Sequence, residues 1–415
     1  MARWLLWLIS LSLLPYGTLW SNQLSHLRSA YKKALRQKDY PAAADALRKI
    51  GDLNTKPAAV FLLSLADKEK LPDEVYQGLL DGFSAINEAD VQEYLFSRAR
   101  SENWRAQLTL LRACAKMKGD KPKQFLLRAL SAKEEALVRQ AVESLAARGD
   151  ATVVDALIDL LEAQQKQKGL LWLTTLEAIK RLTRSPREFL DAADWRNWWH
   201  ARGKKPLTEE ELKKEKGGAD EKMRRYKTSA PQFFGREIAS RRVVFVMDVS
   251  GSMELGKPSR LKRVQQELKH CVERLPQNAR FNIIAFNHKV LVWQKHLVRA
   301  TKKNKKKARK FIDSFVAEGQ THTDEALQAA FSIKDVDNII LLSDGAPYKL
   351  EHGETVSVKF IQEILEWVRK ENRFRKVRID TFGFEEVAQE EDGEILVEFL
   401  KKLAQDNGGV FTNIK

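Results

Sequence analysis

Cysteine is scarce in this chain of 415 residues, which contains only Cys114 and Cys271. The two lie far apart in apolar segments with helical spacing. This arrangement excludes a cysteine-rich metal site and a secreted disulfide framework. We expect both to be small core residues, and the fold to be stabilised by packing instead of cross-links.

Long apolar runs are also missing. The run Trp4–Leu14, which Pro15 and Gly17 break, is shorter than the roughly 20 residues of a membrane-spanning helix. With a basic residue before it, this is the layout of a signal peptide, predicted over residues 1–22. Bulky residues at the expected cleavage position leave an uncleaved membrane anchor as the alternative. In both cases the chain is expected outside the cytoplasm: secreted, periplasmic or anchored in the cell envelope.

Acidic residues are outnumbered, giving a net charge of +16. A basic balance can reflect nucleic acid, an anionic membrane, an acidic partner or only a soluble surface. The stretch Thr301–Lys310 has seven basic residues in ten, without interleaved aromatics or a nucleic-acid motif. Nucleic acid is therefore not expected as a partner. The segment Lys302–Lys310 either binds an anionic surface, such as lipid headgroups, or is the solvated start of a helix.

Strand-like alternation is absent from residues 23–200, where apolar residues recur at spacings of three and four. The pairs Gly119-Asp120 and Gly149-Asp150 each separate two such helices, about 30 residues apart. The stretch from Val138 to Glu162 resembles HEAT and armadillo repeats, and this resemblance implies a helical solenoid. An irregular helical bundle is the alternative.

Three tryptophans in five residues, within Asp194–His200, follow the repeats. They either seal the end of the helical region or form a platform for carbohydrate or a membrane interface. Residues 201–240 are predicted to be a charged linker, because strong mixed charge replaces core-forming residues there. At its end, Phe233 and Phe234 are expected to pack beneath the next domain.

From residue 241 to 415 the pattern changes to apolar strands that alternate with amphipathic helices. It predicts an α/β domain with a doubly wound, mostly parallel sheet, so the chain is expected to be multi-domain. Ligands of such folds bind in loops at the carboxyl ends of the strands.

Three of these loops carry oxygen donors. Asp248, Ser250 and Ser252 follow the first strand, Thr321 precedes a helix, and Asp344 follows a later strand. Oxygen donors suit a hard cation, and neutral hydroxyls leave its charge incompletely cancelled. Because histidine and cysteine are absent from the set, zinc is disfavoured.

This combination resembles the von Willebrand factor A domain. The resemblance implies a metal-ion-dependent adhesion site in which Asp248, Ser250, Ser252, Thr321 and Asp344 hold Mg²⁺, or Mn²⁺ or Ca²⁺. Of the residues beside Thr321, Thr323 is expected to cap its helix and His322 to lie at the rim.

The function expected from these features is non-enzymatic protein binding. The partner would offer an Asp or Glu to the metal, and the repeats would be a scaffold or second surface. Tyr348 and Lys349 are the predicted specificity residues. One alternative is a Mg²⁺-dependent aspartyl phosphotransferase or phosphatase, although such enzymes usually have an acidic residue where Ser250 stands. Another is a structural scaffold with an inactive metal site.

Overall fold

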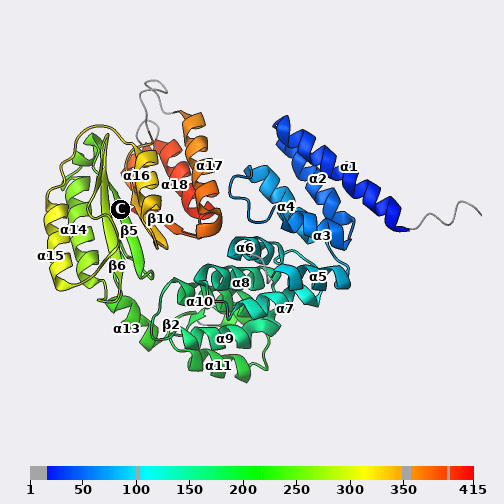
Figure 1. Cartoon of the computed structure of the whole chain (residues 1–415). Helices are drawn as coiled ribbons and strands as arrows, with labels where there is room; N and C mark the ends of the chain where they lie inside the picture. The colour runs from blue at the N-terminus through cyan, green and yellow to red at the C-terminus, as the bar shows by residue number, and fades with distance from the viewer. Residues whose placement is uncertain (1–15, 100–102, 216, 348–356, 390–392) are drawn as a thin grey trace, which may run out of the picture. The chain divides into compact units, whose positions relative to one another are not determined.

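The computed structural model in Figure 1 describes most of the chain, namely residues 16–99, 103–215, 217–347, 357–389 and 393–415. These residues form two compact units, the first ending at Val153 and the second beginning at Val154.

The first helix of the described residues, α1 (Tyr16–Arg36), contains Gly17. The helix tolerates this residue, since one glycine costs a helix only about 1 kcal/mol relative to alanine. Residues 1–15, with the apolar run of the predicted signal segment, lie outside the described residues. None of the helices in the described part of the chain is long and apolar enough to cross a membrane.

The rest of the first unit is a succession of helices that pack in a regular order. They are α2 (Tyr40–Asp52), α3 (Lys56–Leu63), α4 (Asp73–Ala85), α5 (Ala89–Ala99), α6 (Trp104–Ala113), α7 (Asp120–Ala129) and α8 (Glu135–Arg148). From α2 to α6, each helix packs against the helix two places later. This is how two-helix repeats stack in a solenoid, so the prediction of a helical repeat is confirmed.

Polar side chains bind the turns of neighbouring repeats together. The side-chain oxygen of Asn54 accepts the backbone N–H groups of Asn87 and Glu88, at 2.7 and 3.2 Å. The guanidinium of Arg148 donates to the carbonyls of Cys114 and Gly119, at 2.7 and 2.9 Å. Such contacts satisfy backbone groups that the helix ends leave without partners. Cys114, like Cys271 in the second unit, is a free and buried thiol, as predicted.

Helices α2 and α4 approach closely at glycines. A Cβ built on Gly51 would lie 1.9 Å from the carbonyl oxygen of Gly82, and one on Gly78 would lie 2.4 Å from the Cα of Ala44. Both distances are far below van der Waals contact. The two helix backbones therefore touch, and no larger residue fits between them.

Asp150, in the second Gly-Asp turn, is expected to make stability depend on pH. Its carboxylate accepts hydrogen bonds from the hydroxyl of Thr152 at 2.6 Å and from the ammonium of Lys123 at 3.0 Å. These bonds, that from Thr152 foremost, lower the pKa of Asp150 from 3.8 to about 2. A lowered folded-state pKa stabilises the fold at pH values above that of the unfolded chain. This stabilisation is lost as the pH falls from about 4 towards 2.

The test is urea unfolding of Asp150→Asn between pH 7 and pH 2. We expect the variant to be less stable than the parent at pH 7 and to match it near pH 2. Asp120→Asn is the matched control, because Asp120 occupies the same place in the first Gly-Asp turn and its side chain is 81% exposed. Equal pH profiles for the two variants would contradict the assignment.

The second unit begins with helices. These are α9 (Val154–Ala163), α10 (Leu170–Thr183), α11 (Ala192–Ala201), α12 (Glu209–Lys214) and α13 (Glu221–Ser229), with short strands β1 (Arg187–Glu188) and β2 (Gly218–Ala219) paired in parallel. Leu207 and Met223, each 1% exposed, anchor the segment for which the sequence predicts a charged linker. The predicted domain boundaries at residues 200 and 240 stay a prediction.

The sheet of the second unit is doubly wound and mostly parallel, as predicted. Its strands are β5 (Arg242–Asp248), β6 (Arg280–Phe286), β7 (Val290–Val292), β8 (Val298–Arg299), β9 (Asn338–Leu342), β10 (Arg378–Phe384) and β11 (Phe411–Ile414). The order is β11-β10-β9-β5-β6-β7, with β8 also on β6, and only β7 and β8 run antiparallel. The central strands β5, β6 and β9 are buried almost throughout, which explains their continuous apolar sequences.

Helices cover both faces of this sheet. Figure 1 shows α14 (Arg260–Arg274) and α15 (Lys302–Asp313) on one face and α16 (Thr323–Ser332), α17 (Val358–Arg375) and α18 (Gly393–Asp406) on the other. A hairpin of β3 (Gln232–Phe233) and β4 (Arg236–Glu237) precedes the sheet. Phe233 is fully buried there, with its ring 5.0 Å from that of Phe382. The prediction that this residue packs beneath the domain is confirmed.

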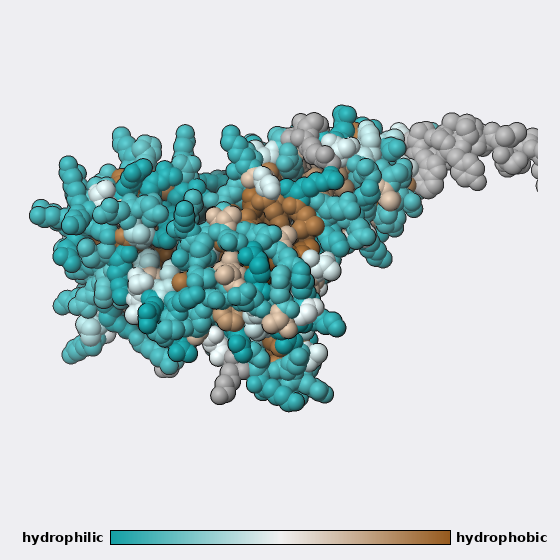
Figure 2. Space-filling view, turned by 90° about the horizontal axis from the view of Figure 1, so that it is seen from below, coloured by the Kyte–Doolittle hydropathy of each residue, from teal (hydrophilic) through white to brown (hydrophobic). Residues whose placement is uncertain are grey.

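The surface is mainly polar. The face in Figure 2 is hydrophilic over most of its area, with one gathering of hydrophobic residues. Among the described residues, the large hydrophobic side chains that are well exposed all belong to the second unit: Leu255, Leu291, Val292, Val316, Val358 and Val410.

Candidate metal centre

Asp248 ends β5, the strand at which the order of the sheet reverses. The chain leaves β5 for β6 on one side, and β9 lies on the other side. Because parallel strands point the same way, the loops after β5 and β9 meet at one edge of the sheet. This reversal point is where doubly wound sheets bind their ligands. Asp248 is fully buried there.

A chain of hydrogen bonds connects four of the five predicted ligands. The backbone N–H of Ser250 donates to Asp248 Oδ1 at 2.8 Å, and the hydroxyls of Ser250 and Ser252 are 3.2 Å apart. The hydroxyl of Ser252 then donates to Asp344 Oδ1 at 2.7 Å. Residues that are 92 positions apart in the sequence thus converge at one place.

Thr321, the fifth predicted ligand, comes from a third loop that is bound to the other two. The N–H of Gly251 donates to the carbonyl of Gly319 at 3.0 Å. Gly345 lies so close to Thr321 that a Cβ on it would be 2.7 Å from the threonine hydroxyl oxygen. A side chain at Gly345 would therefore displace this hydroxyl, which explains why glycine follows Asp344.

The two carboxylates of the site have different surroundings. Burial in the first place, and the nearby charge of Asp344 in the second, raise the pKa of Asp248 to about 7. Asp344 instead accepts a hydrogen bond at Oδ2 from the guanidinium of Arg260, at 2.9 Å. The side chains of this ion pair are 3% and 0% exposed, so solvent hardly screens it.

Two residues of the site were not predicted. Ser343 donates its hydroxyl to Asp248 Oδ2 at 2.5 Å and so fixes the second oxygen of that carboxylate. Arg260 is the first residue of α14, twelve positions after Asp248, and no motif marks it. Ser343 could have been suspected, because it directly precedes Asp344 after a buried strand.

The side chains that meet here suit a hard divalent cation. All five predicted donors are carboxylate or hydroxyl oxygens, the ligands that Mg²⁺ and Ca²⁺ prefer. Two acidic side chains also converge in a buried place, and the guanidinium of Arg260 pairs with only one of them, Asp344. Nowhere in the described ranges do three or more His, Cys, Asp or Glu side chains group as metal ligands. The ligand assignment itself stays a prediction.

The neighbouring predictions have mixed outcomes. His322 is the N-cap residue of α16 and Thr323 is its first helical residue, so the prediction that Thr323 caps the helix is wrong. The side chain of His322 is 18% exposed and lies 3.6 Å from Glu325.

The predicted specificity residues, Tyr348 and Lys349, lie outside the described residues. Six basic side chains of the run on α15 are exposed, so both predictions for this segment stay predictions. They are Lys302, Lys303, Lys306, Lys307, Arg309 and Lys310.

Comparison with known families agrees with both halves of the chain. Residues 241–412 match the von Willebrand factor type A domain, and residues 92–168 match HEAT repeats. The C-terminal part is thus a domain of the von Willebrand factor type A family, preceded by a helical-repeat region, as the sequence predicts.

Each of the following relatives matches less than half of this chain. Inter-alpha-trypsin inhibitor heavy chain H2 of Sus scrofa is 30% identical over an alignment of 184 residues that covers 41% of this chain and 18% of the relative. The human von Willebrand factor A domain-containing protein 3B is 28% identical over 170 residues, 41% of this chain and 11% of the relative. A von Willebrand factor type A structure from Catenulispora acidiphila is 22% identical, with a TM-score of 0.35, and covers 43% of this chain and 40% of that one.

Proposed function

We propose that this protein is an exported, non-enzymatic binding protein. Its von Willebrand factor A domain captures a protein partner through a divalent cation, with Mg²⁺ preferred over Mn²⁺ or Ca²⁺. The observation that carries the proposal is the convergence of three loops, which brings Asp248, Ser250, Ser252, Thr321 and Asp344 together. The helical repeats provide a scaffold or a second contact surface.

The residues around the cation have distinct tasks in this proposal. The hydroxyls of Ser250, Ser252 and Thr321 bind the metal without adding negative charge. Asp248 and Asp344 orient this shell through their hydrogen bonds. When bound, the cation supplies the positive charge that attracts a carboxylate of the partner. Because only two ligands are charged, the ion keeps affinity for that external acid.

The comparisons support the proposal at the level of the domain. The relatives named above carry the same domain, and the name of one of them is inter-alpha-trypsin inhibitor heavy chain H2. Export is supported by the N-terminal sequence, where a basic residue precedes a short apolar run. Membrane anchoring through this segment, and binding of an anionic surface by Lys302–Lys310, remain subsidiary proposals.

The metal can be tested alone by calorimetric titration of the protein with MgCl₂. We expect saturable binding, and an affinity reduced by about 10- to 100-fold or more in Asp248→Asn. Asp335→Asn is the control, because Asp335 is 66% exposed and has a positive φ that asparagine also adopts. Equal Mg²⁺ affinity in Asp248→Asn and the parent would refute the assignment.

The partner's chemistry needs its own assay. Peptides that carry a single Glu or Asp would be compared with otherwise identical peptides carrying Gln or Asn, with Mg²⁺ or EDTA present. The proposal expects retention of the acidic peptides only, and only with Mg²⁺. Retention that is indifferent to EDTA would show that the metal does not mediate binding.

An enzymatic role has less support. Aspartyl phosphotransferases usually have a second acidic residue two positions after the nucleophile, and in this chain that position is Ser250. Hydrolysis of generic phosphate esters that Asp248→Asn abolishes would favour the phosphatase alternative. A scaffold with an inactive site predicts no Mg²⁺ binding in the titration above.

A further inference from the structure

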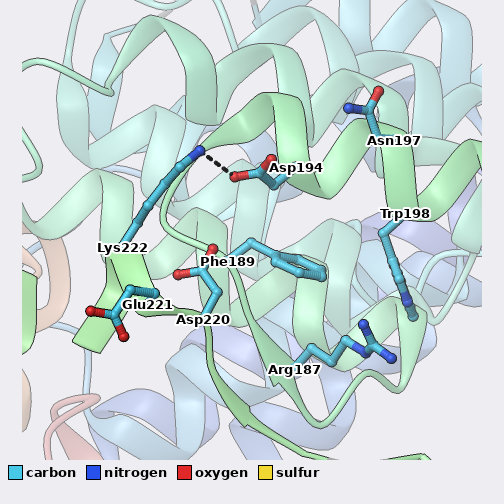
Figure 3. Close-up of a pocket in the computed structure, with 8 residues that line it drawn as sticks. All are labelled: Arg187, Phe189, Asp194, Asn197, Trp198, Asp220, Glu221 and Lys222. Carbon is cyan, nitrogen blue, oxygen red and sulfur yellow. Dashed lines mark hydrogen bonds and ion pairs between the residues drawn. The ribbon is translucent and has the colours of Figure 1, made fainter. Parts of the chain in front are cut away.

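The tryptophan-rich segment borders a hollow that the proposed metal centre does not use. The hollow has a volume of about 430 Å³, is open to solvent, and lies between α11 and the start of α13. This volume is within the range of about 300–1,000 Å³ that is usual for small-molecule sites. In Figure 3, Phe189 and Trp198 lie on one side of it, and Asp220 and Glu221 lie on the other.

The three tryptophans of this segment have separate places. Trp195 and Trp199 are 0% and 1% exposed and belong to the core, whereas Trp198 is only partly buried and lines the hollow. Trp195 holds this aromatic wall in place: its indole N–H donates to the carbonyl of Phe189 at 2.9 Å, and its ring meets that of Trp198 edge-on at 5.9 Å. The hollow therefore has a fixed aromatic wall.

Polar side chains around this aromatic wall have hydrogen-bonding atoms that are not used within the described part of the protein. Asp194, Asp220 and Glu221 each use one carboxylate oxygen, for Lys222, the N–H of Met223 and Arg225, respectively. Within the described ranges, their second oxygens have no hydrogen-bond partner, and neither has the exposed side-chain amide of Asn197. A ligand here must bring several donors, and the amide can serve it as donor or acceptor.

The charge of the lining narrows the ligand class. Arg187 and Lys222 contribute two positive charges, and Asp194, Asp220 and Glu221 contribute three negative ones, so the formal sum is 2 − 3 = −1. A nucleic-acid strand needs a positive groove for its phosphates and is therefore disfavoured. Arg202, which does not line the hollow, lies 5.5 Å from the centroid of the Trp198 ring.

We propose that this hollow binds a neutral saccharide. The apolar face of a sugar ring packs against Trp198 and Phe189, and its hydroxyls, each both donor and acceptor, meet the free carboxylate oxygens and the amide of Asn197. The site is independent of the metal centre, and its ligand adds a glycan to the partners of this chain.

The experiment is a titration of the full chain with maltose, cellobiose, lactose and N,N′-diacetylchitobiose, followed by saturation-transfer difference NMR of the sugar signals, which can be read in every variant. We expect at least one of them to bind with a dissociation constant of about 1 mM, as is reasonable for a shallow site. The substitution Trp198→Ala should weaken the binding of that sugar at least tenfold. Asn197→Ala, on an exposed position that does not endanger folding, should weaken it about threefold to tenfold.

Trp104→Ala is the matched control, because Trp104 is also partly buried and has an arginine, Arg105, 5.0 Å from its ring centroid. The affinity of the Trp104→Ala variant for the sugar should stay within about twofold of the affinity of the parent. The proposal is overturned if no sugar of the panel binds, or if Trp198→Ala and Asn197→Ala bind as Trp104→Ala does. Binding of choline in place of the sugars would also overturn it, since the site would then recognise a cation.

Discussion

Replacement of Arg260 by methionine should destabilise the metal-free protein by about 3–5 kcal/mol, the usual cost of removing one partner from a buried ion pair. The guanidinium of Arg260 donates to Asp344 at 2.9 Å, and both side chains are almost completely buried. Methionine preserves much of the apolar stem but leaves Asp344 without this countercharge. The fully buried Asp248 adds a second acidic group to the same site.

The measurement is urea unfolding with EDTA and again with saturating MgCl₂. Mg²⁺ should restore part of the lost stability, because a cation that binds only the folded state stabilises it. Arg263→Met is the matched control: Arg263 also lies on α14 and over the ring of Phe384, but its side chain is 23% exposed and its pairing with Glu386 is at the surface. The control should lose no more than about 1 kcal/mol. If Arg260→Met also lost no more than about 1 kcal/mol, the buried charge of Asp344 would not depend on this arginine.

Replacement of Gly51 by alanine is the second change with a large expected effect, and it concerns the helical repeats. Alanine alone would stabilise the helix by about 1 kcal/mol. Its Cβ, however, would lie 1.9 Å from the carbonyl oxygen of Gly82 on α4, which is backbone and cannot rotate away. Helices α2 and α4 would have to separate, so we expect a net loss of about 3 kcal/mol, at the upper end for overpacking.

Thermal unfolding followed by circular dichroism would measure this loss. The comparison is Gly149→Ala, where φ is +72° but no atom lies within 4 Å of the new Cβ. That variant should lose only about 1–2 kcal/mol from backbone strain. Equal losses would show that the close approach of α2 and α4 adds nothing to the ordinary cost of replacing a glycine. A smaller loss in Gly51→Ala would show that the helices adjust easily.

The fold was largely predictable because its signals are local. Spacings of three and four residues predicted the helices of the first unit, and continuous apolar strands predicted the parallel sheet of the second. The convergence of Asp248 and Asp344 also followed from sequence, since residues at the carboxyl ends of parallel strands meet at one edge. Thr321, which precedes a helix, was added through the resemblance to the von Willebrand factor A domain. These predictions needed the order of the elements but no distances.

Contacts that depend on packing were not predictable in this way. Arg260 looks like one of many basic residues on an amphipathic helix, and only the fold places it against Asp344. Leu207 and Met223 are isolated apolar residues in a highly charged segment, and nothing local shows that both are buried. Thr323 satisfied the pattern of a helix cap, but the helix begins one residue earlier than that role requires. For the first three residues, the contacts that decide their burial come from residues far away in the sequence. For Thr323, the geometry of the turn before the helix decides.

In the proposed metal-mediated capture, the ion pair of Arg260 and Asp344 would also set the sign of the field that an approaching partner meets. With Asp248 ionised, the three charged side chains sum to −2 + 1 = −1, which repels a carboxylate. A divalent cation changes this sum to −1 + 2 = +1, which attracts one. Without Arg260 the charge would be −2 before the cation binds and 0 afterwards, so the metal would only cancel the repulsion. In this proposal the arginine would make metal binding reverse the sign of the charge at the site instead of only neutralising it.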